Sequence, residues 1–497
     1  MGIIIRQSVK GTAATYIGAF IGFITTVFIQ TKYLAPEDIG LYRVIIDIAS
    51  MFSTLSLLGV TSSAIRFFPY FKNKNNNNNG FFYYLMLLPT IGCFLFIVLF
   101  ILLKVPVSAY FIKESSLIVD YYYWVIPLII VMTYLYALET YANINMRITF
   151  ARFNREIWIR VMTLVVFLIY GYHLITRSEF ITGVILTYAI ALITIFIYTS
   201  RIANTSLKHD YSLISKPLRR DILKYSSVLV TGVLGTTIIS KLDILMVASQ
   251  LGLSSTGIYS IAMYIGAVIE IPSRSIIAIS SPIAAENIKN NDWKSAKQLY
   301  KKVSLHQLLI GGLLFILIWV NIDNIFAIIP NGETYVEGKW VVFFIGMSKM
   351  ITVMFNFGGS LISFSKYYHW TLYFTFFSLG VGILANYWLI SIYGITGASI
   401  AMFVLCVLNY GFQQWIIFRK LKGNPWSTGM TKLLAIMLAL FVVNYFITNS
   451  ANPIVDGLIR TIILSVIACT SVYFLKVSDD LNNTIRTILN RIKSGHA

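Results

Sequence analysis

The 497-residue chain has few charged residues, few acidic residues in particular, and little cysteine. Charged residues are 12% of the sequence, whereas they make up about a quarter of a typical soluble domain, and this deficit excludes a soluble globular protein. The three cysteines, Cys93, Cys406 and Cys469, all lie in apolar stretches, which argues against a disulfide framework and a cysteine metal site. The chain also lacks a polar stretch long enough to form a soluble domain.

Long apolar stretches take the place of the missing charge. Hydrophobic residues are 57% of the chain, and the mean hydropathy is +0.75. A helix needs about 20 apolar residues to cross about 30 Å of hydrocarbon, and such stretches recur throughout, so we expect an all-α polytopic membrane protein. The pattern predicts fourteen spans, at residues 11–33, 40–65, 81–103, 120–140, 157–176, 180–200, 224–249, 257–284, 303–328, 339–364, 369–391, 394–418, 431–448 and 454–475.

The 39 lysines and arginines are distributed unequally among the gaps between these spans. If the N-terminus is cytoplasmic and cations near the end of a span are counted with the adjoining segment, the inner segments hold 29 of them and the outer segments seven, and Lys241, Arg274 and Lys349 lie deep within spans. The positive-inside rule therefore predicts that both termini are cytoplasmic. Contacts with anionic lipid headgroups explain the net charge of +19, so we expect membrane lipids and no nucleic acid as partners. We expect no metal and no cofactor, and the oligomeric state stays open.

The spans divide into two groups of six helices and a final pair. The expected segments are an N-terminal lobe at 1–200, a basic cytoplasmic linker at 201–223, a C-terminal lobe at 224–418, two further helices within 419–475 and an amphipathic cytoplasmic tail at 476–497.

A short internal repeat supports this division. Leu, Gly and Tyr recur at a constant offset of 217 residues, as Leu34, Gly40 and Tyr42 and then as Leu251, Gly257 and Tyr259. An even number of helices per lobe keeps the two copies parallel, so we expect an axis along the membrane normal between them. We expect each glycine to permit a tight turn and each tyrosine to lie in the interfacial aromatic belt.

Ionisable side chains inside a membrane cost free energy, which makes each of them a functional candidate. Besides the three cations within spans, the chain places three carboxylates there, Asp47, Asp243 and Glu270. These six groups predict a polar cavity shared by the two lobes. Arg43 and Glu139 lie close enough to the interfaces for their charged ends to reach water.

Helical spacing predicts two ion pairs, because residues four apart lie on the same face of a helix. These are Arg43 with Asp47, and Glu270 with Arg274. Such a pair either holds helices together or takes part in transport, and for Glu270 and Arg274 both interpretations stay open. Lys349 has no acid three or four residues away, which favours a role in the cavity.

The segment from Gly11 to Pro69 resembles a known family. Gly11 opens a Thr/Gly-rich first helix, and Leu34-Ala-Pro-Glu-x-x-Gly40-Leu-Tyr42, Leu58-Gly59 and Ala64-x-Arg66 follow. These features are similar to the opening of the Wzx-type polysaccharide biosynthesis flippases of the multidrug/oligosaccharidyl-lipid/polysaccharide (MOP) exporter superfamily. The resemblance implies two helical bundles around a central cavity that opens alternately to the two sides of the cytoplasmic (inner) membrane of a bacterium.

The resemblance also implies a cargo and no enzymatic activity. The cargo would be an oligosaccharide linked to undecaprenyl diphosphate, moved to the outer leaflet for export of a cell-surface polysaccharide such as O-antigen, with H+ or Na+ as the coupling ion. The candidate diphosphate ligands are the cations Arg43, Lys241, Arg274 and Lys349, and the candidate ion-coupling residues are Asp47, Asp243 and Glu270.

Two other functions stay open. A membrane glycosyltransferase or polymerase of the same pathway usually carries its acids and arginines on a sizeable external loop, and the external gap at 104–119 is short. A drug or small-solute exporter of the same superfamily usually stops at twelve helices.

Overall fold

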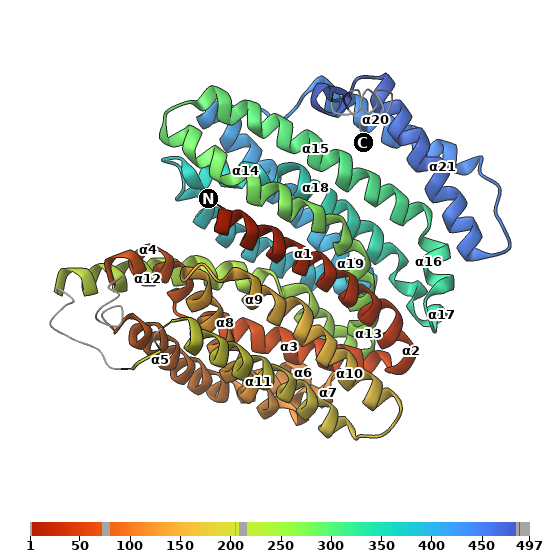
Figure 1. The fold of residues 1–497 in the computed structure, drawn as a ribbon. Coiled ribbons are helices and arrows are strands. Elements are labelled where there is room, and N and C mark those ends of the chain that lie inside the picture. Colours follow the sequence, from red (N-terminus) through yellow and green to blue (C-terminus); the bar gives the residue numbers. More distant parts are fainter. Residues whose placement is uncertain (1, 72–79, 204, 208–215, 484–486, 488–497) are drawn as a thin grey trace. The chain divides into compact units, whose positions relative to one another are not determined.

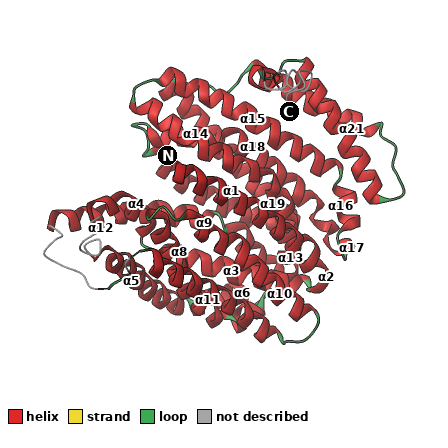
Figure 2. Cartoon of the chain, viewed as in Figure 1, coloured by secondary structure: helices red, strands yellow, loops and turns green. Residues whose placement is uncertain are grey.

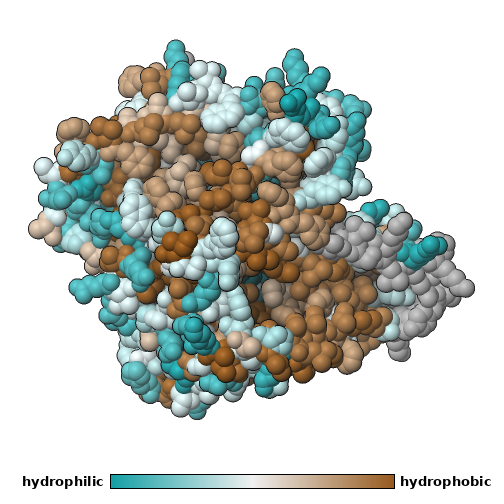
Figure 3. Space-filling model, turned by 180° about the vertical axis from the view of Figure 1, so that it is seen from behind, coloured by the Kyte–Doolittle hydropathy of each residue, from teal (hydrophilic) through white to brown (hydrophobic). Residues whose placement is uncertain are grey.

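Helices make up all the secondary structure of the described part of the chain (Figures 1 and 2). A computed structural model describes residues 2–71, 80–203, 205–207, 216–483 and 487. Within these ranges, 11 helical segments are long and apolar enough to cross a membrane. Figure 3 shows hydrophobic residues over much of the viewed face, with hydrophilic residues gathered towards its edges. The protein is therefore a multi-pass membrane protein, as expected.

The count of fourteen spans depends on three places in the chain. The helical segments Leu242–Lys289 and Trp370–Leu421 each run through parts of two expected spans. The second has 52 residues, and a helix of that length measures about 78 Å, far more than one crossing requires. Gly394 interrupts it with a φ of 58°. The third place is the expected span 157–176, which is not among the 11 segments. The count of fourteen stays a prediction.

The chain forms two compact units. One comprises Met1–Ile261 and Gly382–Ile395, and the other comprises Ala262–Val381 and Thr396–Ala497. The first unit thus includes residues 224–261, which the sequence analysis places in the C-terminal lobe. The lobes at 1–200 and 224–418, the linker at 201–223 and the final helices at 419–475 stay predictions. The amphipathic tail at 476–497 lies largely outside the described residues.

The first unit is built around a buried central helix, α8. Leu135, Leu138 and Ala142 lie three and four residues apart and are buried on this helix. Helix α8 packs against α3, α4, α5 and α11. The helices of this unit are α1 (Gly2–Ile24), η1 (Thr25–Gln30), α2 (Thr31–Tyr33), α3 (Pro36–Ser56), α4 (Val60–Phe71), α5 (Phe81–Leu102), α6 (Lys104–Phe111), α7 (Ser116–Asp120), η3 (Tyr122–Trp124), α8 (Val125–Ile144), α9 (Ile148–Phe153), η4 (Asn154–Trp158), α10 (Ile159–Gly171), α11 (Arg177–Ile202), α12 (Lys216–Ile239) and most of α13 (Leu242–Ala267).

The second unit is built around α15, which packs against α14, α18, α20 and α21. Leu308, Phe315 and Ile316 are buried on α15 in a cluster that includes Leu440 of α20 and Leu464 of α21. The two final helices therefore complete the core of this unit. Its helices are the end of α13, η6 (Val268–Glu270), α14 (Ile271–Lys289), α15 (Trp293–Val320), α16 (Ile322–Ile328), α17 (Gly332–Tyr335), η7 (Val336–Gly338), α18 (Lys339–Phe364), α19 (Trp370–Ile416) except for Gly382–Ile395, which belong to the first unit, η8 (Ile417–Leu421), α20 (Thr428–Tyr445) and α21 (Pro453–Phe474).

The two copies of the internal repeat pack against each other in the first unit. A Cβ atom added to Gly40 would lie 2.0 Å from the backbone oxygen of Leu253, and one added to Gly257 would lie 2.0 Å from that of Pro36. Because Pro36 and Leu253 are themselves 217 residues apart, the two contacts are equivalent. Reciprocal contacts of this kind are what a local two-fold axis produces.

This packing corrects the roles expected for the repeated glycines and tyrosines. Gly40 and Gly257 lie within helices α3 and α13, where they allow close approach of two backbones rather than a tight turn. The break in the second copy falls instead at Gly252, with a φ of 88°. Tyr259 is fully buried, so it does not lie in an interfacial belt.

Candidate functional site

In the first unit, three of the expected charged residues form one cluster around the carboxylate of Asp47. The Nε of Arg43 donates to Oδ2 of Asp47 at 2.9 Å, and the Nζ of Lys241 donates to Oδ1 at 2.6 Å. Each carboxylate oxygen therefore has its own cation. Asp47 is only 2% exposed, and burying a carboxylate is costly unless it is paired in this way. The spacing of Arg43 and Asp47 predicted the first of these bonds correctly.

Lys241 reaches Asp47 from a break between two helices. Helix α12 ends at Ile239 and α13 begins at Leu242, so the expected span 224–249 is interrupted at Ser240 and Lys241. Because of this break, Lys241 and Asp243 do not lie on one regular helix, and their side chains reach different partners. Lys241 binds Asp47, whereas Asp243 accepts a hydrogen bond from the hydroxyl of Tyr259 at 2.7 Å.

The second unit holds the remaining pair of expected residues. The Nζ of Lys349, on α18, lies 2.7 Å from Oε2 of Glu270, and their side chains are 20% and 26% exposed. Lys349 therefore has an acidic partner, which comes from a neighbouring helix and is invisible to helical spacing. The expected role of Lys349 in the cavity stays a prediction.

Glu270 and Arg274 do not form the pair that their spacing predicts. Glu270 ends the short 3-10 turn η6, and α14 begins at Ile271 with Pro272 in its first turn. A 3-10 turn has about three residues per turn, so it shifts the faces of the residues that follow. Glu270 binds Lys349, and Arg274 is exposed and has no ion-pair partner among the described residues.

The Asp47 cluster has the chemistry of an anion site. Two cations share the carboxylate of Asp47, and the carboxylate of Asp243 also interacts electrostatically with Arg43. The side chains of Arg43 and Lys241 are 31% and 23% exposed, whereas Asp47 is buried beneath them. A guanidinium has five N–H donors and an ammonium three, and the bonds to Asp47 use one of each. The remaining donors are suited to phosphate oxygens.

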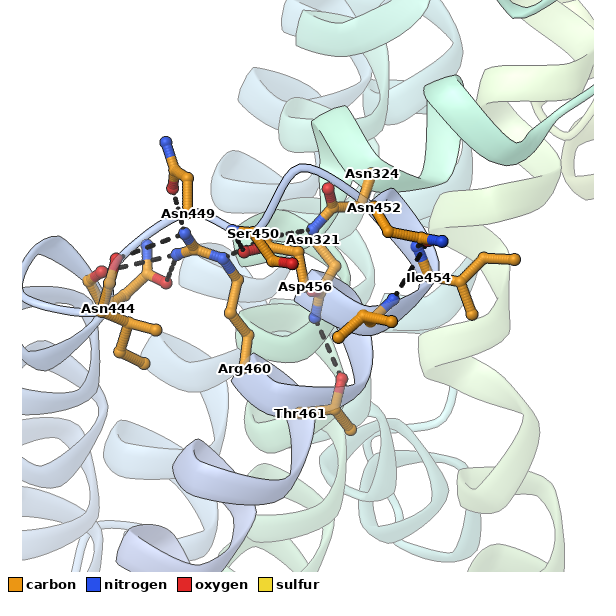
Figure 4. Close-up of polar contacts among 12 residues, drawn as sticks. Asn321, Asn324, Asn444, Asn449, Ser450, Asn452, Ile454, Asp456, Arg460 and Thr461 are labelled. Atoms are coloured by element: carbon orange, nitrogen blue, oxygen red, sulfur yellow. Dashed lines mark hydrogen bonds and ion pairs between the residues drawn. The ribbon is translucent and has the colours of Figure 1, made fainter.

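Helix α21 carries a charged pair that the sequence analysis missed. Arg460 was counted only as an outer basic residue, but it is buried and its Nε lies 2.6 Å from Oδ2 of Asp456. Its guanidinium also donates to Asn444 and Asn449, and Asn324 donates to Asp456 (Figure 4). The acid-first spacing of Asp456 and Arg460 within an expected span was the available signal. Arg460 donates to Asn444 at the end of α20 and to Ile447 and Asn449 in the loop 446–452, so this cluster holds that loop.

Glu139 of α8 is a second residue whose environment was misjudged. It is 6% exposed rather than interfacial, and its Oε2 accepts a hydrogen bond from Arg155 at 3.1 Å. Arg155 also lies 3.8 Å from Glu156, which in turn binds Arg160 at 3.1 Å. These residues come from α8, η4 and α10. Glu156 and Arg160 have helical i,i+4 spacing, whereas only tertiary packing reveals that Arg155 binds Glu139, 16 residues away.

Comparison with known proteins assigns a family. The sequence model of the family described as "polysaccharide biosynthesis protein" matches residues 8–288. An uncharacterized membrane protein of Methanocaldococcus jannaschii is 21% identical in an alignment of 491 residues that covers 94% of each chain.

Two solved structures share the fold over most of the chain. The lipid II flippase MurJ in an inward closed conformation aligns with a TM-score of 0.68 at 12% identity, covering 92% of this chain and 98% of that one. An inward-facing multidrug resistance MATE family transporter of the MOP superfamily aligns with a TM-score of 0.57 at 12% identity, covering 82% and 94%. These likenesses show the fold, and the match to the family model confirms the sequence resemblance to polysaccharide biosynthesis proteins.

Proposed function

The chain belongs to the polysaccharide biosynthesis protein family, and from this premise we propose that it flips a lipid-linked oligosaccharide across a membrane. The proposed cargo is an oligosaccharide on undecaprenyl diphosphate, and the proposed direction is from the cytoplasmic to the outer leaflet of the cytoplasmic membrane. Alternating access of the site to the two sides would move the headgroup for export of a surface polysaccharide. The protein is proposed to act as a transporter and not as an enzyme.

The Asp47 cluster is the observation that carries this proposal. A diphosphate-sugar headgroup is anionic and strongly hydrated, and it needs fixed cations to replace the water that it loses within a membrane. Arg43 and Lys241 supply such cations, and both keep donors that Asp47 does not use. Asp47 fixes the positions of the two cations before an anion arrives, which reduces the entropy lost on binding.

Arg274 and Lys349 are proposed as further ligands of the cargo, and their contributions to cargo binding are expected to differ. Arg274 is exposed and has no ion-pair partner in the described part of the chain, so its charge is available to an anion. Lys349 must share its charge with Glu270. We therefore expect loss of Arg274 to weaken cargo binding more than loss of Lys349.

The three carboxylates differ in their suitability for ion coupling. Asp47 contacts two cations and Glu270 contacts one. Asp243 is buried, accepts a hydrogen bond from Tyr259 and has no ion-pair partner among the residues that the structure describes. A buried carboxylate without a cation gains most from taking up H+ or Na+. We therefore propose Asp243 as the coupling residue, ahead of Asp47 and Glu270.

The decisive experiment follows the cargo between leaflets. The purified full chain is reconstituted into vesicles that contain an undecaprenyl-diphosphate-linked oligosaccharide, and a membrane-impermeant glycosidase reports which headgroups have become accessible. We expect headgroups to cross without growing longer. Lys241→Met and Arg274→Met should slow crossing by roughly tenfold or more, since a hydrogen bond to a charged group contributes about 1.5–3 kcal/mol. Lys339→Met is the control, because Lys339 pairs with the exposed Asp323.

The other outcomes overturn the proposal in distinct ways. Growth of the sugar chain would identify a polymerase or glycosyltransferase. Export of a drug without movement of the lipid-linked sugar would identify an exporter, which the fold shared with a MATE family transporter makes the principal alternative. Ion coupling is tested separately. A pH or Na+ gradient should accelerate crossing of the headgroup by the wild-type protein. Asp243→Asn should abolish this acceleration, while crossing in the absence of a gradient continues.

A further inference from the structure

The first unit contains a half-open cavity of about 560 Å³ away from the Asp47 cluster. Its walls come from the end of α4, the end of α8 and the segment formed by α9 and η4. The positive-inside rule assigns this end of the helices to the cytoplasm. The volume lies within the range of small-molecule binding sites, about 300–1,000 Å³.

The cavity is amphipathic. Ile65, Phe68, Ile144 and Met146 supply apolar walls. Ile65 and Met146 are 64% and 57% exposed, so their side chains are accessible to an apolar occupant. The polar lining is charged and includes Glu139, Arg152 and Arg155. An occupant with both an apolar body and a charged head fits this lining.

The charged lining includes one acidic group, Glu139, with an oxygen that has no hydrogen-bond partner, and one basic group, Arg152, that has no ion-pair partner among the described residues. Glu139 is buried, its Oε2 binds Arg155, and its Oε1 is buried without a hydrogen-bond partner. Arg155 is shared between Glu139 and Glu156, so it does not fully neutralise either carboxylate. Arg152 is exposed and has no ion-pair partner among the described residues. The site thus offers an acceptor for a cation and a donor for an anion.

From this geometry we infer a binding site for an ethanolamine phospholipid of the cytoplasmic leaflet. Its phosphate would bind Arg152, its ammonium would donate to Glu139, and an acyl chain would lie against the apolar walls. Phosphate and ammonium are two carbons apart in this headgroup, so one ligand can satisfy both protein groups. The ammonium has three N–H donors, whereas the quaternary ammonium of a choline lipid has none and a glycerol lipid carries no cation. This inference does not depend on the proposed cargo.

Lipid binding to the purified full chain tests the inference. Native mass spectrometry would compare phosphatidylethanolamine, phosphatidylcholine and phosphatidylglycerol with the same acyl chains. We expect phosphatidylethanolamine to bind at least roughly tenfold more tightly than the others, as one charged hydrogen bond predicts. Glu139→Gln should remove the preference for ethanolamine, and Arg152→Gln should weaken all three lipids. Arg201→Gln is the control, because Arg201 is exposed at the end of α11 and does not line the cavity.

One further variant and two contrary outcomes complete this test. Ile65→Trp fills the cavity from an exposed position and leaves Glu139 intact, so it should abolish the preference even if Glu139→Gln folds poorly. Equal binding of ethanolamine and choline lipids would overturn the inference. Tightest binding of phosphatidylglycerol would also overturn it, because the site would then recognise anionic charge alone.

Discussion

The protein contains two Asp–Arg pairs with the same helical spacing and opposite environments. Arg43 and Asp47 lie on α3, and Asp456 and Arg460 lie on α21. Both partners of the second pair are 7% exposed, whereas Arg43 is 31% exposed above a carboxylate that is 2% exposed. The Arg43 pair has an additional cation, Lys241, and the Arg460 pair has only neutral amides around it.

This difference distinguishes a candidate binding site from a purely structural ion pair. In the Arg460 cluster the charges cancel, and asparagine side chains and backbone groups bind the remaining donors and acceptors (Figure 4). In the Asp47 cluster two cations share one carboxylate, and the side chains of both cations are partly exposed. A neutral and saturated network stabilises a loop, and a partly exposed one in which two cations share a carboxylate can bind an anion. Ion-pair spacing alone does not distinguish the two.

The largest loss of stability is expected on breaking the Arg460 cluster. Arg460→Met leaves Asp456 buried without a cation, which costs about 3–5 kcal/mol of the free energy of unfolding. Thermal unfolding of the purified protein in detergent measures this. The matched control is the double variant Asp456→Asn with Arg460→Met, in which no buried charge is left unpaired. It should recover part of the loss, and equal losses in both variants would show that packing, not charge, governs this cluster.

A smaller loss is expected in the Asp47 cluster. Lys241→Met leaves Arg43 in contact with Asp47, so only one charged hydrogen bond is lost, or about 1.5–3 kcal/mol. The same variant should nevertheless affect flipping far more than Arg460→Met does at temperatures where both proteins are folded. Parallel unfolding and vesicle-crossing measurements give the two effects. If Arg460→Met slows crossing as strongly as Lys241→Met, the distinction between an anion-binding site at Asp47 and a structural ion pair at Asp456 is wrong.

The repeat contact should respond to a single methyl group. Gly40→Ala or Gly257→Ala places a Cβ 2.0 Å from a backbone oxygen, so the two helices must separate. Overpacking of this kind costs about 1–3 kcal/mol. Because the two contacts are equivalent, the two variants should lose similar stability. Gly411→Ala is the control, since a Cβ there has nothing within 4 Å. Unfolding temperatures that fall for one glycine only would refute the local two-fold relation.

The sequence predicted features that depend on local periodicity. The span 339–364 coincides with α18, and the Arg43–Asp47 bond follows from spacing on one helix. Pairings between helices could not be predicted, because Lys241 and Asp47 are 194 residues apart and Glu270 and Lys349 are 79 apart. The helix break at Ser240 also escaped prediction, because apolar character continues through it. The break at Gly394, by contrast, falls where the expected span 394–418 begins.

The smallest effect is expected for an exposed ion pair, which calibrates the other two. The Nζ of Lys339 lies 2.5 Å from Oδ1 of Asp323, and these side chains are 31% and 78% exposed. Water solvates both charges when the pair is broken, so Lys339→Met should change the free energy of unfolding by less than about 1 kcal/mol. Thermal unfolding beside Arg460→Met and Lys241→Met places the three pairs on one scale. If burial sets the cost of losing a cation, the variants that leave the buried Asp456 or Asp47 should lose more stability than Lys339→Met, which leaves the exposed Asp323. The further difference in stability between Arg460→Met and Lys241→Met then measures the contribution of Arg43, which remains with Asp47 when Lys241 is removed.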